Sequence, residues 1–381
     1  MGQSYTKVTH TSWGGKIMNS FVGALIGALL FLGSFVLLWV NEGRTDWSVV
    51  ARGSTAVEAS AVDRGAEGKF VSVSGPLSAA EPLGDEPYLK PGAYVNLQRV
   101  VEMYAWEEQS SSETRDNIGG GSTTTTTYTY SKKWTSSPAN SSGFEVPAGH
   151  ENPPLSVEGR DLRAAQLSVG AYQLVAAEIG LPGGQELRLT PEMVTPVEGA
   201  RLEGKYIFQG LGTPQSPQVG DVRISYRALP VGAQVTAFGT LEGDTVAPYL
   251  HRGEDVFYRA VEGGRANAIE SLHTEFVVIG WILRLVGFLM MWIGLSMVFG
   301  PITAFLDVLP ILGDISGFAI SVVTFVAAAI LSIITIVIAV LAHNLLALIV
   351  VLLLVAGGVY AWGLSKRGAI SARTSGSTSK P

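Results

Sequence analysis

The segment IMNSFVGALIGALLFLGSFVLLWV, residues 17–40, is predominantly apolar and contains no charged side chain. Its 24 residues are enough for an α-helix to cross the ~30 Å hydrocarbon core of a bilayer. Three more apolar segments follow near the other end of the chain, at 276–305, 315–342 and 345–364. The pattern predicts four transmembrane helices, one before and three after a long polar segment.

The long polar segment predicts a domain outside the membrane. Residues 41–275 are numerous enough to bury a core of their own, as one domain or two small ones. The first apolar segment is too long for the core of a signal peptide and leads into Trp39-Val40-Asn41-Glu42, so we expect a retained anchor. The remaining pieces are a tail at 1–16, a link at 306–314, a tail at 365–381 and an interfacial part within 276–305.

Charge predicts the orientation of the chain. The 381 residues are 47% hydrophobic and 15% charged, with a net charge of −6. Residues 41–275 hold 19 basic and 30 acidic side chains, whereas the charged residues of both tails are all basic. By the positive-inside rule both tails are cytoplasmic, and the large domain is periplasmic in a bacterium or lumenal in a eukaryote.

Several functions are disfavoured by composition. An acidic domain does not suit nucleic acid, which binds clustered Lys and Arg. The chain has no cysteine, which excludes disulfides, thiolate catalysis and Cys-ligated metals. Its five histidines lack metal-ligand spacing, and no Gly-x-Ser-x-Gly elbow is present. We therefore expect neither an enzyme nor a cofactor.

The large domain has the alternation typical of half-buried strands. Residues 69–75, 94–104, 221–226 and 233–238 alternate apolar and polar side chains, and Gly or Pro punctuates each run. The fold class predicted is thus membrane α plus β, with a β-rich extracytoplasmic domain between helices one and two. Residues 69–77 and 233–241 resemble each other weakly, either as an internal repeat or by chance.

A Ser/Thr-rich run interrupts the strand pattern. Residues 110–127 contain Gly119-Gly-Gly-Ser followed by five threonines. The low complexity predicts a mobile hairpin loop. It does not fit a phosphate-binding loop, because no Gly-Lys-Ser/Thr closes it.

Polar residues at the ends of the apolar segments have more than one interpretation. Asn41-Glu42-Gly43-Arg44 would end and anchor the first helix, with Gly43 in the left-handed C′ conformation, or would dock a partner. Arg284 would lie at the interface beside Trp281 or belong to an ion path. Asp307 and Asp314, with Pro310 between them, would shape a turn or bind a cytoplasmic partner.

Glycines in the apolar segments predict helix packing. Gly23 and Gly27 form a Gly-x-x-x-Gly pair, while Gly280, Gly287 and Gly294 recur every seven residues. Small residues along one helix stripe let two backbones approach closely. The contact would lie within the four-helix unit or between copies of the chain.

Aromatic residues flank the Ser/Thr-rich run. Trp106 precedes it, and Tyr128, Tyr130 and Trp134 follow it. They would pack as cross-strand pairs or form a recognition surface. Further along, His150 would be a turn histidine that bonds nearby backbone, or a base oriented by Glu151.

Taken in order, these motifs resemble the transmembrane protein 43 family, also called LUMA. The matching residues are Asn41, Glu42, Gly43 and Arg44; Glu102, Met103, Tyr104 and Trp106; Tyr128, Tyr130 and Trp134; Gly149, His150, Asn152 and Pro153; Gly220, Asp221 and Arg223; and Asp307, Pro310 and Asp314. The resemblance covers about residues 17–364 and implies four spans around a large lumenal domain. In animals the family is placed in the endoplasmic reticulum and inner nuclear membrane, as an organiser of membrane protein complexes. The composition here fits a bacterial member, and the family offers no catalytic residue to carry over.

Two functions of different class follow. The first is a non-enzymatic membrane scaffold that gathers other membrane proteins or its own copies and contacts membrane lipids. The alternative is a transport or channel protein, or its accessory subunit, that uses Arg284, Asp307 and Asp314.

Overall fold

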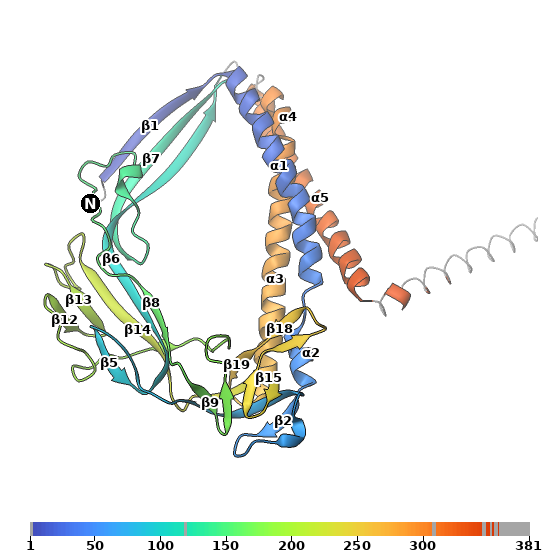
Figure 1. Cartoon of the computed structure of the whole chain (residues 1–381). Coiled ribbons are helices and arrows are strands. Elements are labelled where there is room, and N and C mark those ends of the chain that lie inside the picture. Colours follow the sequence, from blue (N-terminus) through green and yellow to red (C-terminus); the bar gives the residue numbers. More distant parts are fainter. Residues whose placement is uncertain are drawn as a thin grey trace, which may run out of the picture. The chain divides into compact units, whose positions relative to one another are not determined.

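The computed structural model describes residues 3–117, 120–306, 310–344, 348–350, 353 and 357 (Figure 1). The chain forms two compact units. The β unit comprises Met1–Thr9, Asp46–Arg115 and Thr123–Phe276, and the helical unit comprises His10–Thr45, Asp116–Ser122 and Val277–Pro381.

The first sheet of the β unit has eight strands. Its main order is β1-β7-β6-β14-β13-β12, with β8 added to β6 and β11 added to β14. The strands are β1 (Gln3–Thr11), β6 (Tyr94–Asp116), β7 (Ser122–Thr135), β8 (Arg160–Arg163), β11 (Gln185–Glu186), β12 (Ala200–Glu203), β13 (Tyr206–Gln209) and β14 (Val222–Pro230). Strands β6 and β14 are antiparallel, with Val101 opposite Ile224, and both side chains are buried.

The second sheet closes on itself. Strand β15 pairs with β16 and with β3, and the path β16-β10-β9-β3 completes a ring of five strands; β19 and β2 extend it. The strands are β2 (Thr55–Glu58), β3 (Phe70–Ala79), β9 (Leu167–Val169), β10 (Tyr172–Leu174), β15 (Gln234–Glu242), β16 (Thr245–Ala247) and β19 (Arg259–Glu262). Apolar side chains of the ring strands, among them Val73, Val169 and Ala237, form one core. Closure leaves few free edges, which otherwise invite strand addition.

Short elements complete the β unit. They are the helix α2 (Trp47–Arg52), two 3₁₀ turns (Arg64–Ala66 and Ser141–Gly143), and the two-stranded hairpins β4 (Leu83–Asp85) with β5 (Leu89–Gly92) and β17 (Tyr249–His251) with β18 (Asp255–Phe257).

The four alternating runs of the sequence all lie on strands β3, β6, β14 and β15, and the β-rich character of the large domain is confirmed. The two similar segments, 69–77 and 233–241, include β3 and β15, which pair with Val73 opposite Ala237.

The predicted mobile hairpin loop over residues 110–127 is a hairpin, because β6 pairs with β7, but the prediction that the run is a loop is wrong. Strand β6 continues to Asp116 and β7 begins at Ser122, so most of the run is strand. Ser112 and Thr126 hydroxyls lie 2.9 Å apart, as do those of Thr114 and Thr124. Thr is β-branched, favours extended backbone and pairs across strands through its hydroxyl, so low complexity did not mean disorder here.

In the described part of the chain, the helical unit is built from three long apolar helices and one short one. These are α1 (Trp13–Glu42), α3 (Arg265–Val298), which enters this unit at Val277, α4 (Gly300–Leu306) and α5 (Pro310–His343). Among the described residues, three stretches are long and apolar enough to cross a membrane: Trp13–Arg52, which contains α1, Arg265–Val298 and Phe318–His343. The fourth predicted helix, 345–364, lies almost wholly outside the described residues.

The helices pack through a small shared core. Leu38 of α1, Met291 of α3 and Ala328 of α5 are fully buried together. Trp292 donates its indole N–H to the carbonyl of Ser321 at 3.1 Å, and the hydroxyls of Ser296 and Thr324 are 2.8 Å apart. Such side-chain hydrogen bonds join helices in lipid, where hydrophobic burial gives little preference for one partner.

Candidate functional site

The end of α1 carries an ion pair with α3. The Glu42 carboxylate accepts two hydrogen bonds from Arg284, Nε to Oε1 and Nη2 to Oε2, both 2.7 Å. The Glu42 side chain is only 5% exposed, and the guanidinium lies 5.0 Å from the ring centroid of Trp281. The charge of Arg284 is therefore matched within the helical unit, by a carboxylate and by an aromatic face.

Asn41 ties the same two helices together beside the ion pair. Its Nδ2 donates to Glu42 Oε1 at 3.1 Å and to the carbonyl of Gly280 at 3.3 Å. Its Oδ1 is buried and has no hydrogen-bond partner among the described residues. We call Asn41, Glu42, Gly280, Trp281 and Arg284 the helix clamp, because together they fix the end of α1 against α3.

Gly43 ends α1 differently from the prediction. Its φ of −88° is right-handed, not the left-handed C′ conformation. A Cβ at Gly43 would lie 2.6 Å from His343 Nε2. The glycine makes room for the end of α5 and is not needed for backbone conformation. Arg44 follows, and its Nε donates to the carbonyl of Asn41 at 3.4 Å.

The glycines of α1 and α3 approach each other most closely at Gly27 and Gly294. A Cβ on Gly27 would lie 2.6 Å from the carbonyl oxygen of Gly294, and one on Gly294 would lie 2.7 Å from that of Gly27. Gly287 packs against Leu38, and a Cβ on Gly287 would likewise lie too close to that side chain. A Cβ on Gly23 would have room, with Met297 Cε 4.0 Å away, and one on Gly280 would lie 3.2 Å from Arg44 Nη2. The close contacts belong to α1 and α3 of a single chain.

In the β unit, Asn152 acts as a backbone mimic. Its Oδ1 accepts from the N–H of Trp106 at 2.7 Å, while its Nδ2 donates to the carbonyls of Trp106 and Ala139 at 2.9 and 3.1 Å. The amide side chain thus satisfies backbone groups that a neighbouring strand would otherwise pair. Next to it, Pro153 packs 2.9 Å from the position of a Cβ on Gly220, whose φ is +96°.

His150 is enclosed by aromatic rings. It stacks on Tyr130 at 3.9 Å and meets the edge of Trp106 at 4.7 Å. Its Nδ1 lies 2.9 Å from the carbonyl of Val146, and its buried Nε2 has no hydrogen-bond partner among the described residues. Glu151 instead accepts from the N–H of Gly149, whose φ is +81°. This geometry does not provide the carboxylate-oriented base that the sequence left open.

Tyr130 is the polar centre of this cluster. Its hydroxyl donates to Glu108 Oε2 at 2.7 Å and accepts from the N–H of Val146 at 3.0 Å. Burial, assisted by the Glu108 carboxylate, raises the pKa of Tyr130 to about 12. The phenol stays protonated and holds the 144–150 segment against β6 and β7.

Other aromatic residues form a ladder across the same sheet. Arg223 pairs with Glu102 at 2.7 Å, and its guanidinium lies between Trp134 and Tyr206, 4.5 and 4.6 Å from the ring centroids. Tyr104 packs on Trp134 at 5.5 Å, and Tyr128 lies 6.4 Å from Tyr5. The neighbouring Met103 is fully buried.

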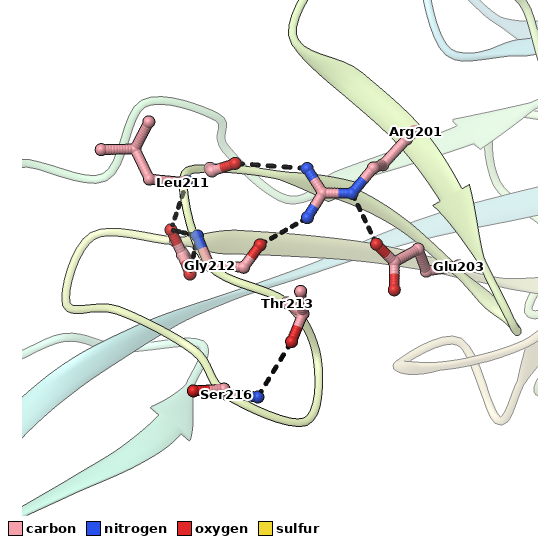
Figure 2. Close-up of polar contacts among 8 residues, drawn as sticks. Arg201, Glu203, Leu211, Gly212, Thr213 and Ser216 are labelled. Atoms are coloured by element: carbon pink, nitrogen blue, oxygen red, sulfur yellow. Dashed lines mark hydrogen bonds and ion pairs between the residues drawn. The ribbon is translucent and has the colours of Figure 1, made fainter.

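Asp221 organises the loop before β14. Its buried carboxylate accepts from the N–H groups of Leu211 (3.0 Å), Gly212 (3.1 Å) and Gln218 (2.7 Å). From the other side, Arg201 donates to the carbonyls of Gly210 and Gly212 and pairs with Glu203, as Figure 2 shows. The loop is held firmly, yet the Leu211 side chain is 90% exposed.

For three other residues singled out by the sequence, the structure gives at most a position along the backbone. Asp307 lies outside the described residues. Pro310 and Asp314 fall on the first turns of α5. Within the described ranges, no group of three or more His, Asp or Glu side chains is arranged to hold a metal ion.

The fold defines a class: a multi-pass membrane protein with a β-rich domain inserted after its first apolar helix. The family model for transmembrane protein 43 matches residues 103–345, which is more than half of the chain. The chain belongs to the transmembrane protein 43 family.

Several animal proteins are similar to the chain. Transmembrane protein 43 of Mus musculus is 27% identical over 353 residues, and that of Homo sapiens is 27% identical over 354; each alignment covers 84% of both chains. A transmembrane protein 43 homolog of Drosophila melanogaster is 27% identical over 285 residues, covering 72% of this chain and 75% of the homolog. No solved structure matches the chain.

Proposed function

We propose that the chain is a non-enzymatic scaffold of a bacterial inner membrane, which gathers other membrane proteins or further copies of itself. One observation carries the proposal: several polar side chains of the family motifs are bonded to backbone or side-chain groups of the fold itself. Asn152 satisfies the backbone of Trp106, Asp221 binds three N–H groups and Glu42 holds Arg284. Such networks rigidify a shape and leave few groups free for chemistry.

The alternative is transport through Arg284, Asp307 and Asp314. An ion path needs charges that can exchange partners. The two short hydrogen bonds from Arg284 to Glu42 instead favour a fixed pair. We therefore place transport second.

The proposed topology has four spans, the fourth at 345–364, with both tails cytoplasmic and the β unit outside. Lys7 before α1, Lys16 in the first turn of α1 and the four basic residues after position 364 support it, as does the acidic surplus of 41–275. One set of contacts opposes it: strand β1 pairs with β7, although β1 precedes α1 and β7 follows it. The topology therefore requires β1 to leave β7 when α1 enters the membrane.

Photocrosslinking in intact membranes tests the scaffold. A photoreactive residue at Leu29 of α1, whose side chain is 72% exposed, is compared with one at Leu38, which is fully buried. The scaffold predicts discrete protein adducts at Leu29 and none at Leu38. Absence of protein adducts at Leu29 and at the similarly exposed Leu25 and Leu32, together with ion flux through reconstituted protein that Arg284→Met abolishes, would favour transport instead.

A further inference from the structure

The hairpin of β17 and β18 has two unlike faces. Tyr249 lies opposite Phe257, His251 opposite Asp255, and Leu250 opposite Val256. Because side chains alternate along a strand, the Leu250–Val256 pair points away from the Tyr249–Phe257 pair. Leu250 is 53% exposed and Val256 62% exposed, so an apolar cross-strand pair is turned toward the surroundings of the β unit.

The opposite face of the hairpin is firmly packed. Phe257 is buried and stacks on Trp47 of α2 at 4.7 Å, and Tyr249 stacks on Phe70 at 4.1 Å. The hairpin therefore cannot roll over to bury Leu250 and Val256 without breaking these stacks.

The turn is also fixed. Arg252 has a φ of 53° and Gly253 a φ of 78°, while the N–H of Glu254 donates to the carbonyl of His251 at 3.2 Å. Two successive residues with positive φ match the twist of a tight hairpin, but an arginine in that conformation is disfavoured. The arrangement keeps a cationic side chain at the turn, where glycine or asparagine would be easier to accommodate.

The hairpin packs on an apolar cluster, from which the chain continues into the apolar helices. The cluster contains Ala51 of α2, Phe257, and Ala268, Ile269 and Leu272 of α3. Only four residues, Gly43 to Asp46, separate the end of α1 from the start of α2. Helix α3 runs without interruption from this cluster into its apolar stretch. Both membrane connections of the β unit thus start at the base of this one hairpin.

We propose that the Leu250–Val256 face rests in the headgroup layer of the bilayer and that Arg252 meets lipid phosphate there. Glu254 in the turn and Asp255 at the start of β18 disfavour insertion of the tip, so the hairpin lies on the lipid by its face. The inference rests on the membrane anchorage and is independent of the scaffold role. Shallow apolar contact of this kind adds to anchoring and restricts tilting of a domain on its tethers.

The test uses the full-length chain, which has no native cysteine, in nanodiscs of phosphatidylcholine with an anionic lipid. Single variants Leu250→Cys and Val256→Cys carry an environment-sensitive fluorophore, and a fraction of the lipid carries a nitroxide close to the headgroup. The matched control is Leu211→Cys, the same residue type at 90% exposure on the loop before β14.

We expect the nitroxide to quench labels at 250 and 256 several-fold more than the label at 211, and aqueous iodide to quench them in the opposite order. The proposal would be overturned if the nitroxide quenched the labels at 250 and 256 no more than the label at 211. This holds whether all three labels are quenched or none is. Preference of these two labels for iodide would overturn it as well. Both positions are exposed, so labelling is compatible with folding, and an unchanged thermal midpoint checks this.

Discussion

Lys7 Nζ lies 2.8 Å from Glu145 Oε1, so a side chain that precedes α1 pairs with one that follows it. Tyr5 and Tyr128 repeat the relationship, with ring centroids 6.4 Å apart. A helix that crosses a bilayer once places the residues on its two sides in different compartments. These contacts and the proposed topology therefore exclude each other in the inserted protein.

The first prediction is that β1 is not paired with β7 in native membranes. Cysteines at Tyr5 and Tyr128 should form no disulfide under mild oxidation, because α1 keeps them on opposite sides. As a control, cysteines at Ser112 and Thr126, whose hydroxyls lie 2.9 Å apart across β6 and β7, should crosslink readily. Efficient crosslinking of the 5/128 pair would mean that α1 does not separate β1 from the β unit.

The second prediction concerns the helix clamp. Arg284→Met leaves the buried Glu42 carboxylate without its partner, which costs roughly 3–5 kcal/mol when a buried pair is broken. Glu42→Gln should cost less, because the Arg284 side chain is 29% exposed and its charge stays partly solvated. The double variant should cost much less than the sum of the two singles, as measured by reversible unfolding in detergent. The exposed pair Arg259–Glu275 gives the control, because exposed pairs contribute about 1 kcal/mol or less. Additive effects of the two clamp variants would show that the pair is not coupled.

Third, the two glycines of the Gly-x-x-x-Gly pair should differ. Gly27→Ala places a methyl group 2.6 Å from the carbonyl oxygen of Gly294, so the helices must move apart, with a cost of about 1–3 kcal/mol typical of overpacking. Gly23→Ala meets only Met297 Cε at 4.0 Å and should be neutral. The thermal midpoints of the two variants decide this, and equal midpoints would contradict the contact.

The fourth prediction is a pH dependence at the start of α2. Asp46 caps this helix by accepting from the N–H of Ser48 at 2.9 Å, and His273 Nδ1 lies 3.5 Å from its carboxylate. Partial burial raises the pKa of Asp46, but the hydrogen bonds from Ser48 and His273 outweigh burial and hold the pKa below its usual range. A depressed carboxyl pKa stabilises the fold above the unfolded pKa of about 3.9, and this stability is lost as pH falls through the folded pKa.

Asp46→Ala should therefore cost about 0.5–2 kcal/mol at neutral pH, the usual value of a helix cap, and less at about pH 3. Asp46→Asn keeps a capping oxygen without the charge and should show little change of cost with pH. Unfolding of the full chain in detergent at the two pH values measures both. A constant cost for Asp46→Ala would contradict the role of the carboxylate.

Local patterns were enough for most of the strands. Residues 94–104 and 221–226 alternate because one face of β6 and of β14 is buried, and period 2 reports that directly. Which strands pair is a different matter. The closure of β15 on β3 joins segments about 160 residues apart and leaves no trace in either one alone.

The candidate site residues show the same difference: local patterns identified single residues but not their partners. Glu42 and Arg284 each stood out, but their pairing depends on how α1 and α3 pack, which one sequence does not reveal. The role of Asn152 as a backbone mimic was missed, because an asparagine in a loop carries no signal for a partner 46 positions away. Strand β1 was also missed, since its alternation is short and lies in a segment assigned to the tail.

The most direct test of the account is the sidedness of α1. Cysteines at Tyr5, in β1, and at Ser142, an exposed residue of the β unit, are treated with a membrane-impermeant thiol reagent in intact spheroplasts and again after lysis. The account predicts that Ser142→Cys reacts in intact spheroplasts and Tyr5→Cys only after lysis. Reaction of both before lysis would contradict it, and would show that α1 does not carry the chain from the cytoplasm to the other side.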